Sequence, residues 1–278
     1  MDADIPETLG LIAGRGAYPR LLAAGARRQG VRRIVAVAFR GETDRAIAAL
    51  ADRVEWLHVG QIEGLIAALQ RHGITQAIMV GQIAPSNLFQ LRLDATARAI
   101  LARLKARNAR TIFGAVADEL RAAGVRLLPA YRFLEDSLPA PGVLGRRAPT
   151  ERERADMELG LRAARAVGSL EIGQTVVVKD GIILAVEAFE GTDATLRRAG
   201  KLGGRGAVAV KAARPDHDMR YDIPVVGLRT LAVLKSIRAA ALAVEARRTL
   251  LLETDQLVAA ADRQGLALVA LAAGGPAA

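Results

Sequence analysis

Short apolar runs that alternate with amphipathic stretches constrain the first half of the chain most strongly. Residues 9–14, 32–39 and 74–81 are rich in aliphatic side chains, whereas residues 18–30 and 64–73 have the spacing of amphipathic helices. Apolar strands that alternate with helices are typical of a parallel sheet covered on both faces. The pattern predicts an N-terminal Rossmann-like domain, completed by a long helical region over residues 88–122.

The periodicity breaks at residues 134–153, where three prolines and two glycines interrupt it. Such a stretch is typical of a boundary between domains. We predict an N-terminal Rossmann-like domain over residues 1–134, a linker over residues 135–150 and a C-terminal α/β domain over residues 151–278.

The second half predicts a mixed α/β domain. Asp180 and Gly181 lie between two β-branched runs, which is a strong hairpin signal for residues 174–188. The remaining expected elements are helices at 153–170, 193–200, 230–246 and 254–265, and strands at 206–213, 222–228, 249–253 and 266–272.

Composition excludes several kinds of site. The chain has no cysteine, so disulfides, thiolate zinc sites and cysteine nucleophiles are excluded, and a metal would need oxygen or imidazole ligands. Residues 1–10 lack the profile of a signal peptide, and every apolar run is shorter than the roughly 20 residues of a membrane span. We therefore expect a cytoplasmic protein.

The charge balance points to anionic partners. The chain has 39 Lys and Arg against 29 Asp and Glu, a net charge of +10. Nucleotide phosphates, nucleic acid and a negative membrane surface would all be attracted, although a GC-rich genome that favours Ala and Arg codons gives the same composition. Aromatic residues make up only 3% of the chain, so stacking platforms for nucleic acid are scarce.

Gly14 and Gly16 lie between the first expected strand and helix. Such a loop offers backbone N–H groups to a phosphate or a sugar, or it merely forms a tight turn. Pro19 replaces the third glycine of a dinucleotide-binding motif, and Phe39 and Arg40 stand where a ribose-binding acid would end the second strand. Dinucleotide redox chemistry is therefore disfavoured.

Two later segments crowd carboxylates and basic residues together. The first surrounds Gly191 and precedes Arg197 and Arg198; its polar members are Glu187, Glu190, Thr192 and Asp193. The second spans residues 211–222 and contains Lys211, Asp216, His217, Asp218, Arg220 and Asp222. Phosphoryl transfer needs both kinds of group, because a divalent cation and basic side chains together neutralise the phosphate oxygens. A helix capped by Thr192 or Asp193 and a charged surface loop are the alternative interpretations.

Four segments together resemble one family, the UDP-2,3-diacylglucosamine pyrophosphatases of the LpxI type. They are GLIAGRGAYP (10–19), LPAPGVLGRRAPT (138–150), EIGQTVVVKDGIILAVEAFEGTDATLRR (171–198) and VKAARPDHDMRYDIPVVG (210–227). The last two segments are long and specific, and the resemblance covers nearly the whole chain.

The resemblance implies a two-domain α/β hydrolase of lipid A biosynthesis with its site between the domains. Such an enzyme cleaves UDP-2,3-diacylglucosamine to UMP and 2,3-diacylglucosamine 1-phosphate (lipid X) by water attack on the α-phosphorus, with Mg²⁺ or another divalent cation such as Mn²⁺. It implies a lipid-linked UDP-sugar as partner, no nucleic acid, a possible homo-oligomer, and a peripheral location at the cytoplasmic face of the inner membrane in a Gram-negative cell.

The resemblance also assigns residues. Asp222 is the essential, metal-binding aspartate, with Asp218 as supporting carboxylate and Arg220 as phosphate binder. Substrate-binding positions are Gly14, Gly16, Gln174, Glu187, Glu190, Thr192, Asp193, Lys211 and His217. His217 departs from the family pattern, which usually has Gln there, so the pH profile is expected to differ. A noncatalytic nucleotide-sugar or lipid-binding protein, a pyrophosphatase for another nucleotide sugar and a nucleic-acid-binding module are the competing interpretations.

Overall fold

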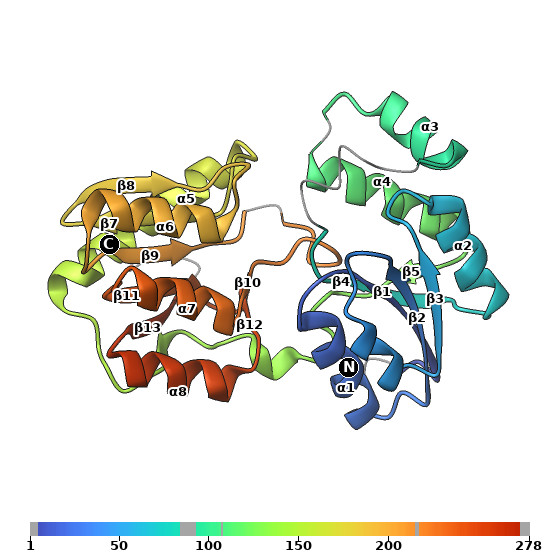
Figure 1. The fold of residues 1–278 in the computed structure, drawn as a ribbon, viewed down its shortest axis with the longest axis horizontal. Helices are drawn as coiled ribbons and strands as arrows, with labels where there is room; N and C mark the ends of the chain where they lie inside the picture. Colours follow the sequence, from blue (N-terminus) through green and yellow to red (C-terminus); the bar gives the residue numbers. More distant parts are fainter. Residues whose placement is uncertain (1–4, 84–92, 107, 215–216, 273–278) are drawn as a thin grey trace. The chain divides into compact units, whose positions relative to one another are not determined.

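The computed structural model describes residues 5–83, 93–106, 108–214 and 217–272. The chain forms two compact units (Figure 1). Unit 1 contains residues 1–135 and also residues 218–222, and unit 2 contains residues 136–217 and 223–278. The chain therefore leaves unit 2 after His217, contributes five residues to unit 1 and returns at Ile223.

Unit 1 is built on a five-stranded parallel sheet with the strand order β3-β2-β1-β4-β5. Its strands are β1 (Thr8–Ala13), β2 (Arg33–Phe39), β3 (Arg53–Leu57), β4 (Gln76–Val80) and β5 (Arg126–Leu127). Its helices are α1 (Tyr18–Arg28), the 3₁₀ turn η1 (Arg45–Ala49), α2 (Ile62–Arg71), α3 (Ala95–Arg103) and α4 (Ala109–Ala122). The Rossmann-like layout expected from the sequence is confirmed.

One face of this sheet is covered by α2 and α4, which share a hydrophobic cluster with Ile12, Val35 and Val37, and α3 joins this cluster through Ile100. The helical region expected over 88–122 is divided: α3 ends before Leu104, whose backbone is extended, and Asn108 caps the start of α4. Residues 88–92 of that expectation lie outside the described residues.

Unit 2 is built on a mixed six-stranded sheet with the order β6-β13-β11-β9-β7-β8. Strands β9, β11 and β13 are parallel, and β6, β7 and β8 join as antiparallel neighbours. The bounds are β6 (Gly142–Val143), β7 (Thr175–Lys179), β8 (Ile182–Val186), β9 (Val208–Lys211), β11 (Ala241–Glu245) and β13 (Ala267–Leu271), with β10 (Val225–Val226) and β12 (Leu250–Leu251) forming a separate parallel pair.

Helices cover both faces of this sheet (Figure 1). Helix α5 (Glu151–Ser169) packs on Val176, Val178 and Val208. On the other face lie α6 (Thr192–Gly203), α7 (Leu228–Ser236) and α8 (Thr254–Gln264). A short 3₁₀ turn, η3 (Glu135–Ser137), precedes β6. Within the described residues, none of the helices has the length and apolar character needed to cross a membrane.

The β7–β8 hairpin is confirmed. Asp180 and Gly181 have φ values of 54° and 78°, the left-handed conformations of a two-residue type I′ turn. The buried carboxylate of Asp156 on α5 accepts from the N–H of Asp180 (2.9 Å) and of Gly181 (2.7 Å). The turn is thus fixed to the helix beneath it.

The helix expected over residues 230–246 is wrong. Helix α7 ends at Ser236, Arg238 adopts a left-handed φ of 52°, and Ala241–Glu245 forms the buried strand β11 between β9 and β13. Alanine favours helix intrinsically, but small side chains at a sheet centre allow helices to pack closely on both faces, and this tertiary context overrides propensity.

We predict that Asp156→Ala lowers the free energy of unfolding by about 3 kcal/mol, because the two turn N–H groups lose their acceptor. Urea denaturation measures the change. Asp156→Asn keeps an acceptor oxygen and should cost less. A loss below about 0.5 kcal/mol for the alanine variant would mean that the turn sequence alone holds the hairpin.

Candidate functional site

Four side chains meet where β7, β8 and β9 approach the start of α6, and we call them the strand-end cluster: Thr175, Glu187, Thr192 and Lys211. Thr175 lies directly opposite Lys211 in the sheet. Lys211 Nζ donates to Thr192 Oγ1 (2.9 Å), and Thr192 Oγ1 donates to Glu187 Oε1 (2.8 Å). The sequence placed Glu187, Thr192 and Lys211 in one site, and the structure brings these three together.

The strand-end cluster is buried and keeps an uncommitted acceptor. Glu187 and Lys211 are only 7% and 6% exposed. Within the described residues, Glu187 Oε2 and Gln174 Oε1 are buried without a hydrogen-bond partner. Buried polar atoms are normally paired, so these two oxygens are candidates to receive a ligand or a cation. Gly173 makes the packing possible, since a Cβ there would lie 2.0 Å from the Glu187 carbonyl oxygen.

Helix α6 starts at this cluster without a side-chain cap. Its N-cap residue is Gly191, with φ of 80°, and within the described residues no side chain caps the first turn. The alternative interpretation, a cap at Thr192 or Asp193, is wrong: Thr192 bonds to Glu187, and Asp193 pairs with Arg229 at 2.6 Å. In the described structure the first turn therefore presents N–H groups without a side-chain cap, and its first residue, Thr192, bonds to Lys211, an arrangement that favours an anion.

Glu190 is held by its own neighbours. Its carboxylate accepts from Arg198 Nη2 (2.7 Å), Thr195 Oγ1 (3.1 Å) and the N–H of Ala188 (3.1 Å). The hydrogen bond from Arg198 lowers the pKa of Glu190 most. Glu190 and Asp193 thus lie next to the strand-end cluster in the chain but bond to other partners.

The segment Asp218–Asp222 is a compact turn within unit 1. The N–H groups of Tyr221 (3.2 Å) and Asp222 (2.9 Å) both donate to the Asp218 carbonyl oxygen. Arg220 donates two hydrogen bonds to the Asp218 carboxylate, from Nε to Oδ1 (2.9 Å) and from Nη2 to Oδ2 (2.6 Å). This hydrogen bonding holds the pKa of Asp218 below its ordinary value. Asp218 and Arg220, predicted as separate groups, form one bidentate ion pair.

Aromatic packing and one backbone bond anchor the turn to unit 1. The N–H of Ala130 donates to the Met219 carbonyl oxygen (2.7 Å). The Tyr221 ring packs beside Phe113, with ring centroids 6.5 Å apart, and faces Gly114, where a Cβ would lie 3.2 Å from the tyrosine oxygen. The turn that carries Asp222 is thereby fixed to unit 1.

The glycine loop is joined to a second loop that the sequence did not pair with it. Arg15 N–H donates to the Gln82 carbonyl oxygen (2.7 Å), and Gln82 N–H donates back (3.2 Å). A Cβ at Gly14 would lie 2.7 Å from the Gln82 carbonyl oxygen, and Gly81 has φ of +93°. These loops follow β1 and β4, where the strand order reverses, which is the position at which open α/β sheets bind ligands.

Gly16, with φ of +96°, completes this loop before α1. Arg15 Nε contacts the buried carboxylate of Glu42 at 3.1 Å. Glu42 comes three residues after the end of β2, so a search for an acid at the strand end missed it. Arg15, Glu42 and Gln82 are therefore additional polar residues at this loop.

The sequence also missed a buried ionic network in unit 2. Glu245, fully buried at the end of β11, accepts from Arg165 Nη2 (2.8 Å) and from the N–H of Ala213 (2.9 Å). In the sequence, Glu245 was recognisable as an acid at the end of an apolar run, but that run was interpreted as part of a helix over residues 230–246.

Two further predicted residues lie near this part of the chain. His217 N–H donates to the Arg214 carbonyl oxygen (3.3 Å). Asp216 lies outside the described residues.

Apart from His217, which bonds to the Arg214 carbonyl oxygen in unit 2, the predicted residues in the described part of the chain fall into three groups: the strand-end cluster with Gln174, Glu190 and Asp193 beside it, the turn Asp218–Asp222, and the glycine loop. Among the described residues, no three His, Asp or Glu side chains gather as a preformed metal site. A divalent cation that used this chain would need oxygens from elsewhere, such as phosphate and water.

Sequence comparison finds relatives along nearly the whole chain. Residues 8–137 match the model of the LpxI N-terminal domain, and residues 140–269 match that of the LpxI C-terminal domain. The chain is 31% identical over 271 residues to the UDP-2,3-diacylglucosamine pyrophosphatase LpxI of Caulobacter vibrioides. The aligned region covers 93% of this chain and 95% of that protein.

Comparison of structures gives weaker matches. A biotin carboxylase complex from Campylobacter jejuni has a TM-score of 0.29 at 11% identity, covering 70% of this chain and 41% of that chain. The biotin carboxylase domain of Hydrogenobacter thermophilus 2-oxoglutarate carboxylase has a TM-score of 0.29 at 12% identity, covering 69% and 40%. At these TM-scores the likeness carries no argument about this chain.

We predict that Arg220→Gln raises the pKa of Asp218 toward its ordinary value, as followed by carboxyl carbon NMR. The folded pKa is lowered, so the ion pair stabilises the turn above the unfolded pKa, and this contribution is lost as the pH falls through the folded pKa. Arg121→Gln, which removes an exposed ion pair to Asp118, is the control and should leave Asp218 unchanged. An ordinary pKa for Asp218 in the native protein would contradict the geometry.

Proposed function

Because the chain belongs to the LpxI family, we propose that two groups of its residues carry out the hydrolysis of UDP-2,3-diacylglucosamine, a reaction of lipid A biosynthesis. The observation that carries this function is the match to both domain models together with a pyrophosphatase relative aligned over 93% of the chain. The groups are the strand-end cluster of unit 2 and the turn Asp218–Asp222 of unit 1.

The reaction breaks one P–O bond. Water attacks the α-phosphorus, and the oxygen that bridges the two phosphates leaves with the β-phosphate. The products are UMP and 2,3-diacylglucosamine 1-phosphate, and the proton released by water must pass to a base or to solvent. Negative charge grows on the leaving oxygen, so groups that stabilise anions lower the barrier.

The strand-end cluster supports a role in holding a phosphate. Lys211 supplies a buried positive charge, and the uncapped first turn of α6 supplies N–H groups beside it. Thr192 links Lys211 to Glu187, because its hydroxyl accepts from Lys211 and donates to Glu187. Arg220 is the second phosphate-binding group, and Gln174 and His217 are further polar contacts to the substrate. Gly14 and Gly16 form the loop proposed to contact the sugar or the nucleotide.

The oxygen chemistry of these groups fits Mg²⁺ or Mn²⁺. These ions bind through one or two carboxylates together with phosphate oxygens and water, so a cluster of three protein ligands is not required. The orphaned oxygen Oε2 of Glu187 is one available donor. Asp222 is the carboxylate we propose to hold the ion, which would neutralise charge on the phosphates when bound.

The substrate carries two acyl chains and so belongs to a lipid surface. We propose that the protein works at the cytoplasmic face of the inner membrane, attracted by its net charge of +10. Substrate presented in a bilayer, rather than free in solution, is then the physiological form.

We predict that Asp222→Asn reduces UMP release from micellar UDP-2,3-diacylglucosamine at least about 100-fold with Mg²⁺ present. Electron paramagnetic resonance should also show weaker Mn²⁺ binding by the variant in the presence of both products. Asp118→Asn, an exposed aspartate on α4 of the same unit, is the control. Full activity and full Mn²⁺ affinity in Asp222→Asn would remove Asp222 from the site.

We predict that Thr192→Val lowers kcat/KM by about 10- to 100-fold, because a hydrogen bond to a charged group contributes about 1.5–3 kcal/mol. Thr192→Ser keeps the hydroxyl between Lys211 and Glu187 and should restore most of the activity. Circular dichroism checks that both variants fold. Equal activity of the valine and serine variants would show that the strand-end cluster is only structural.

A further inference from the structure

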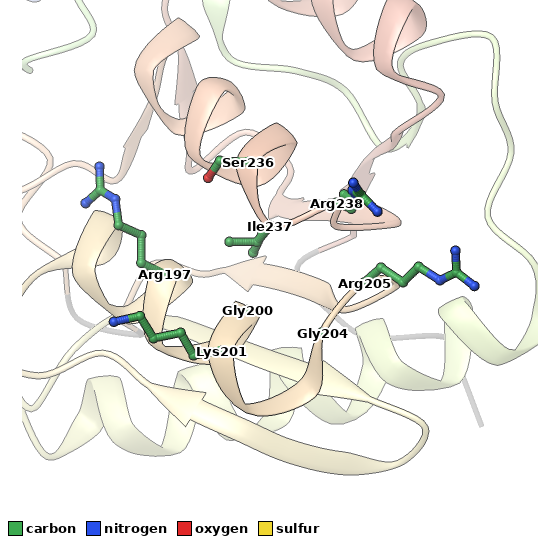
Figure 2. Close-up of a pocket in the computed structure, with 8 residues that line it drawn as sticks. All are labelled: Arg197, Gly200, Lys201, Gly204, Arg205, Ser236, Ile237 and Arg238. Atoms are coloured by element: carbon green, nitrogen blue, oxygen red, sulfur yellow. The ribbon is translucent and has the colours of Figure 1, made fainter.

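The C-terminal end of α6 forms a hollow of about 350 Å³ that is lined by four basic side chains, Arg197, Lys201, Arg205 and Arg238 (Figure 2). We call it the basic hollow. Thr192 of the strand-end cluster begins α6, whereas Gly200 and Lys201 of the basic hollow lie eight and nine residues later, about 12–14 Å along the axis at 1.5 Å per residue. Arg197 is nearer, about 7.5 Å from Thr192 along the axis, and the rest of the hollow lies toward the other end of the helix from the strand-end cluster.

Close packing between α6 and the end of α7 creates this surface. Gly200 allows the approach, because a Cβ there would lie 2.4 Å from Ile237 Cγ2. Arg197 and Lys201 are one helical turn apart and so lie on the same side of α6 as Gly200. The N–H of Gly206 donates to the Arg238 carbonyl oxygen (2.8 Å), which brings Arg205 and Arg238 to the opposite side of the hollow.

The charge of the basic hollow is not neutralised by the protein. No acidic residue lines it, and within the described part of the chain none of the four basic side chains forms an ion pair. The neighbouring Arg198, by contrast, pairs with Glu190 at 2.7 Å. The hollow is thus a local concentration of positive charge that attracts anions.

Arg238 occupies a backbone conformation that suits glycine better. Its φ of 52° is left-handed, which is unfavourable for a residue with a Cβ. A functional reason for an arginine there is that its side chain adds to the charge of the hollow.

The direction of the side chains indicates the kind of anion. In Figure 2 the side chains of Arg197 and Lys201 extend to one side of the hollow and that of Arg205 extends to the other. One phosphate needs donors that converge on a point, whereas diverging cations suit many phosphates spread over a plane. Helix α5, which covers the opposite face of the sheet, does not belong to this surface.

We propose that the basic hollow docks unit 2 on an anionic lipid bilayer. This rests on the proposed function, because the diacylated substrate has to be collected from a membrane. Each basic side chain close to an anionic surface strengthens binding about fivefold, so the four together are enough to set which face of unit 2 meets the lipid.

The test is co-sedimentation of the full chain with phosphatidylcholine vesicles that contain or lack phosphatidylglycerol. The native chain should bind the anionic vesicles, less so at high salt, and Lys201→Gln/Arg205→Gln should bind them about 25-fold more weakly. Arg154→Gln/Arg162→Gln removes the same charge from exposed positions on α5 and should bind nearly as well as the native chain. Arg238→Gly relieves the unfavourable φ, so it should keep or raise the melting temperature while it weakens binding about fivefold.

Equal losses of vesicle binding in Arg154→Gln/Arg162→Gln and in Lys201→Gln/Arg205→Gln would overturn the proposal in favour of net charge alone. The proposal would also be overturned if the native chain did not bind anionic vesicles. Displacement of the native chain from these vesicles by millimolar inorganic phosphate at constant ionic strength would overturn it as well, since such displacement indicates a site for a single phosphate. Hydrolysis of micellar substrate is measured in parallel and should be unchanged in Lys201→Gln/Arg205→Gln. Vesicle binding without any hydrolysis by the native chain would contradict the proposed function and leave the docking result standing.

Discussion

The buried carboxylate of Glu245 fixes the backbone just after β9. The candidate site depends on this contact, because Lys211 is the last residue of β9 and the turn Asp218–Asp222 follows it in the chain. The carboxylate bonds to the N–H of Ala213, two residues after Lys211, and to Arg165 on α5. Arg248 lies 3.8 Å away and donates in turn to the Arg214 carbonyl oxygen. Removing one partner from a buried ion pair costs about 3–5 kcal/mol, so this network is strongly constrained. It sets the direction in which residues after Lys211 depart from the sheet.

Residues that are close in sequence are divided by this departure. Lys211 and His217 belong to unit 2, while Asp218, Arg220 and Asp222 belong to unit 1. The turn in unit 1 carries its own contacts, because Asp218 holds the backbone of Asp222 and Tyr221 packs beside Phe113. Each unit therefore positions its own group of candidate residues, and neither group depends on the other for its local geometry.

Local signals in the sequence predicted what local physics decides. The Asp180-Gly181 turn was found because few residues adopt two successive left-handed conformations. Strands β1, β2 and β4 were found because every residue after the first one in each strand is apolar. Strand β3 was missed because its sequence, RVEWL, interleaves charged and apolar residues in a short segment.

Tertiary contacts account for the rest. The bond between Arg15 and Gln82 joins residues far apart in the chain, and the ion pair of Glu42 depends on the path of the loop after β2. The helix expected over 230–246 failed because Ala241–Glu245 is taken into the sheet centre, which also hid Glu245. The crowding of carboxylates and basic residues identified Asp222, Lys211 and Thr192, and the family resemblance added roles for them, but neither contained information on their bonding partners.

Pairing of charges gives an independent reason for a divalent cation. The two cations proposed to bind phosphate already have carboxylates nearby: Lys211 reaches Glu187 through Thr192, and Arg220 binds Asp218 directly. Both groups are therefore close to electrically neutral, and Asp222 adds a further negative charge to the turn. A pyrophosphate would meet little net positive charge from these residues alone. Its negative charge has to be neutralised by positive charge at the site if it is to bind well. If Asp222 holds a divalent ion as proposed, its carboxylate would supply the kind of oxygen that Mg²⁺ and Mn²⁺ prefer, and the ion's charge would restore the balance.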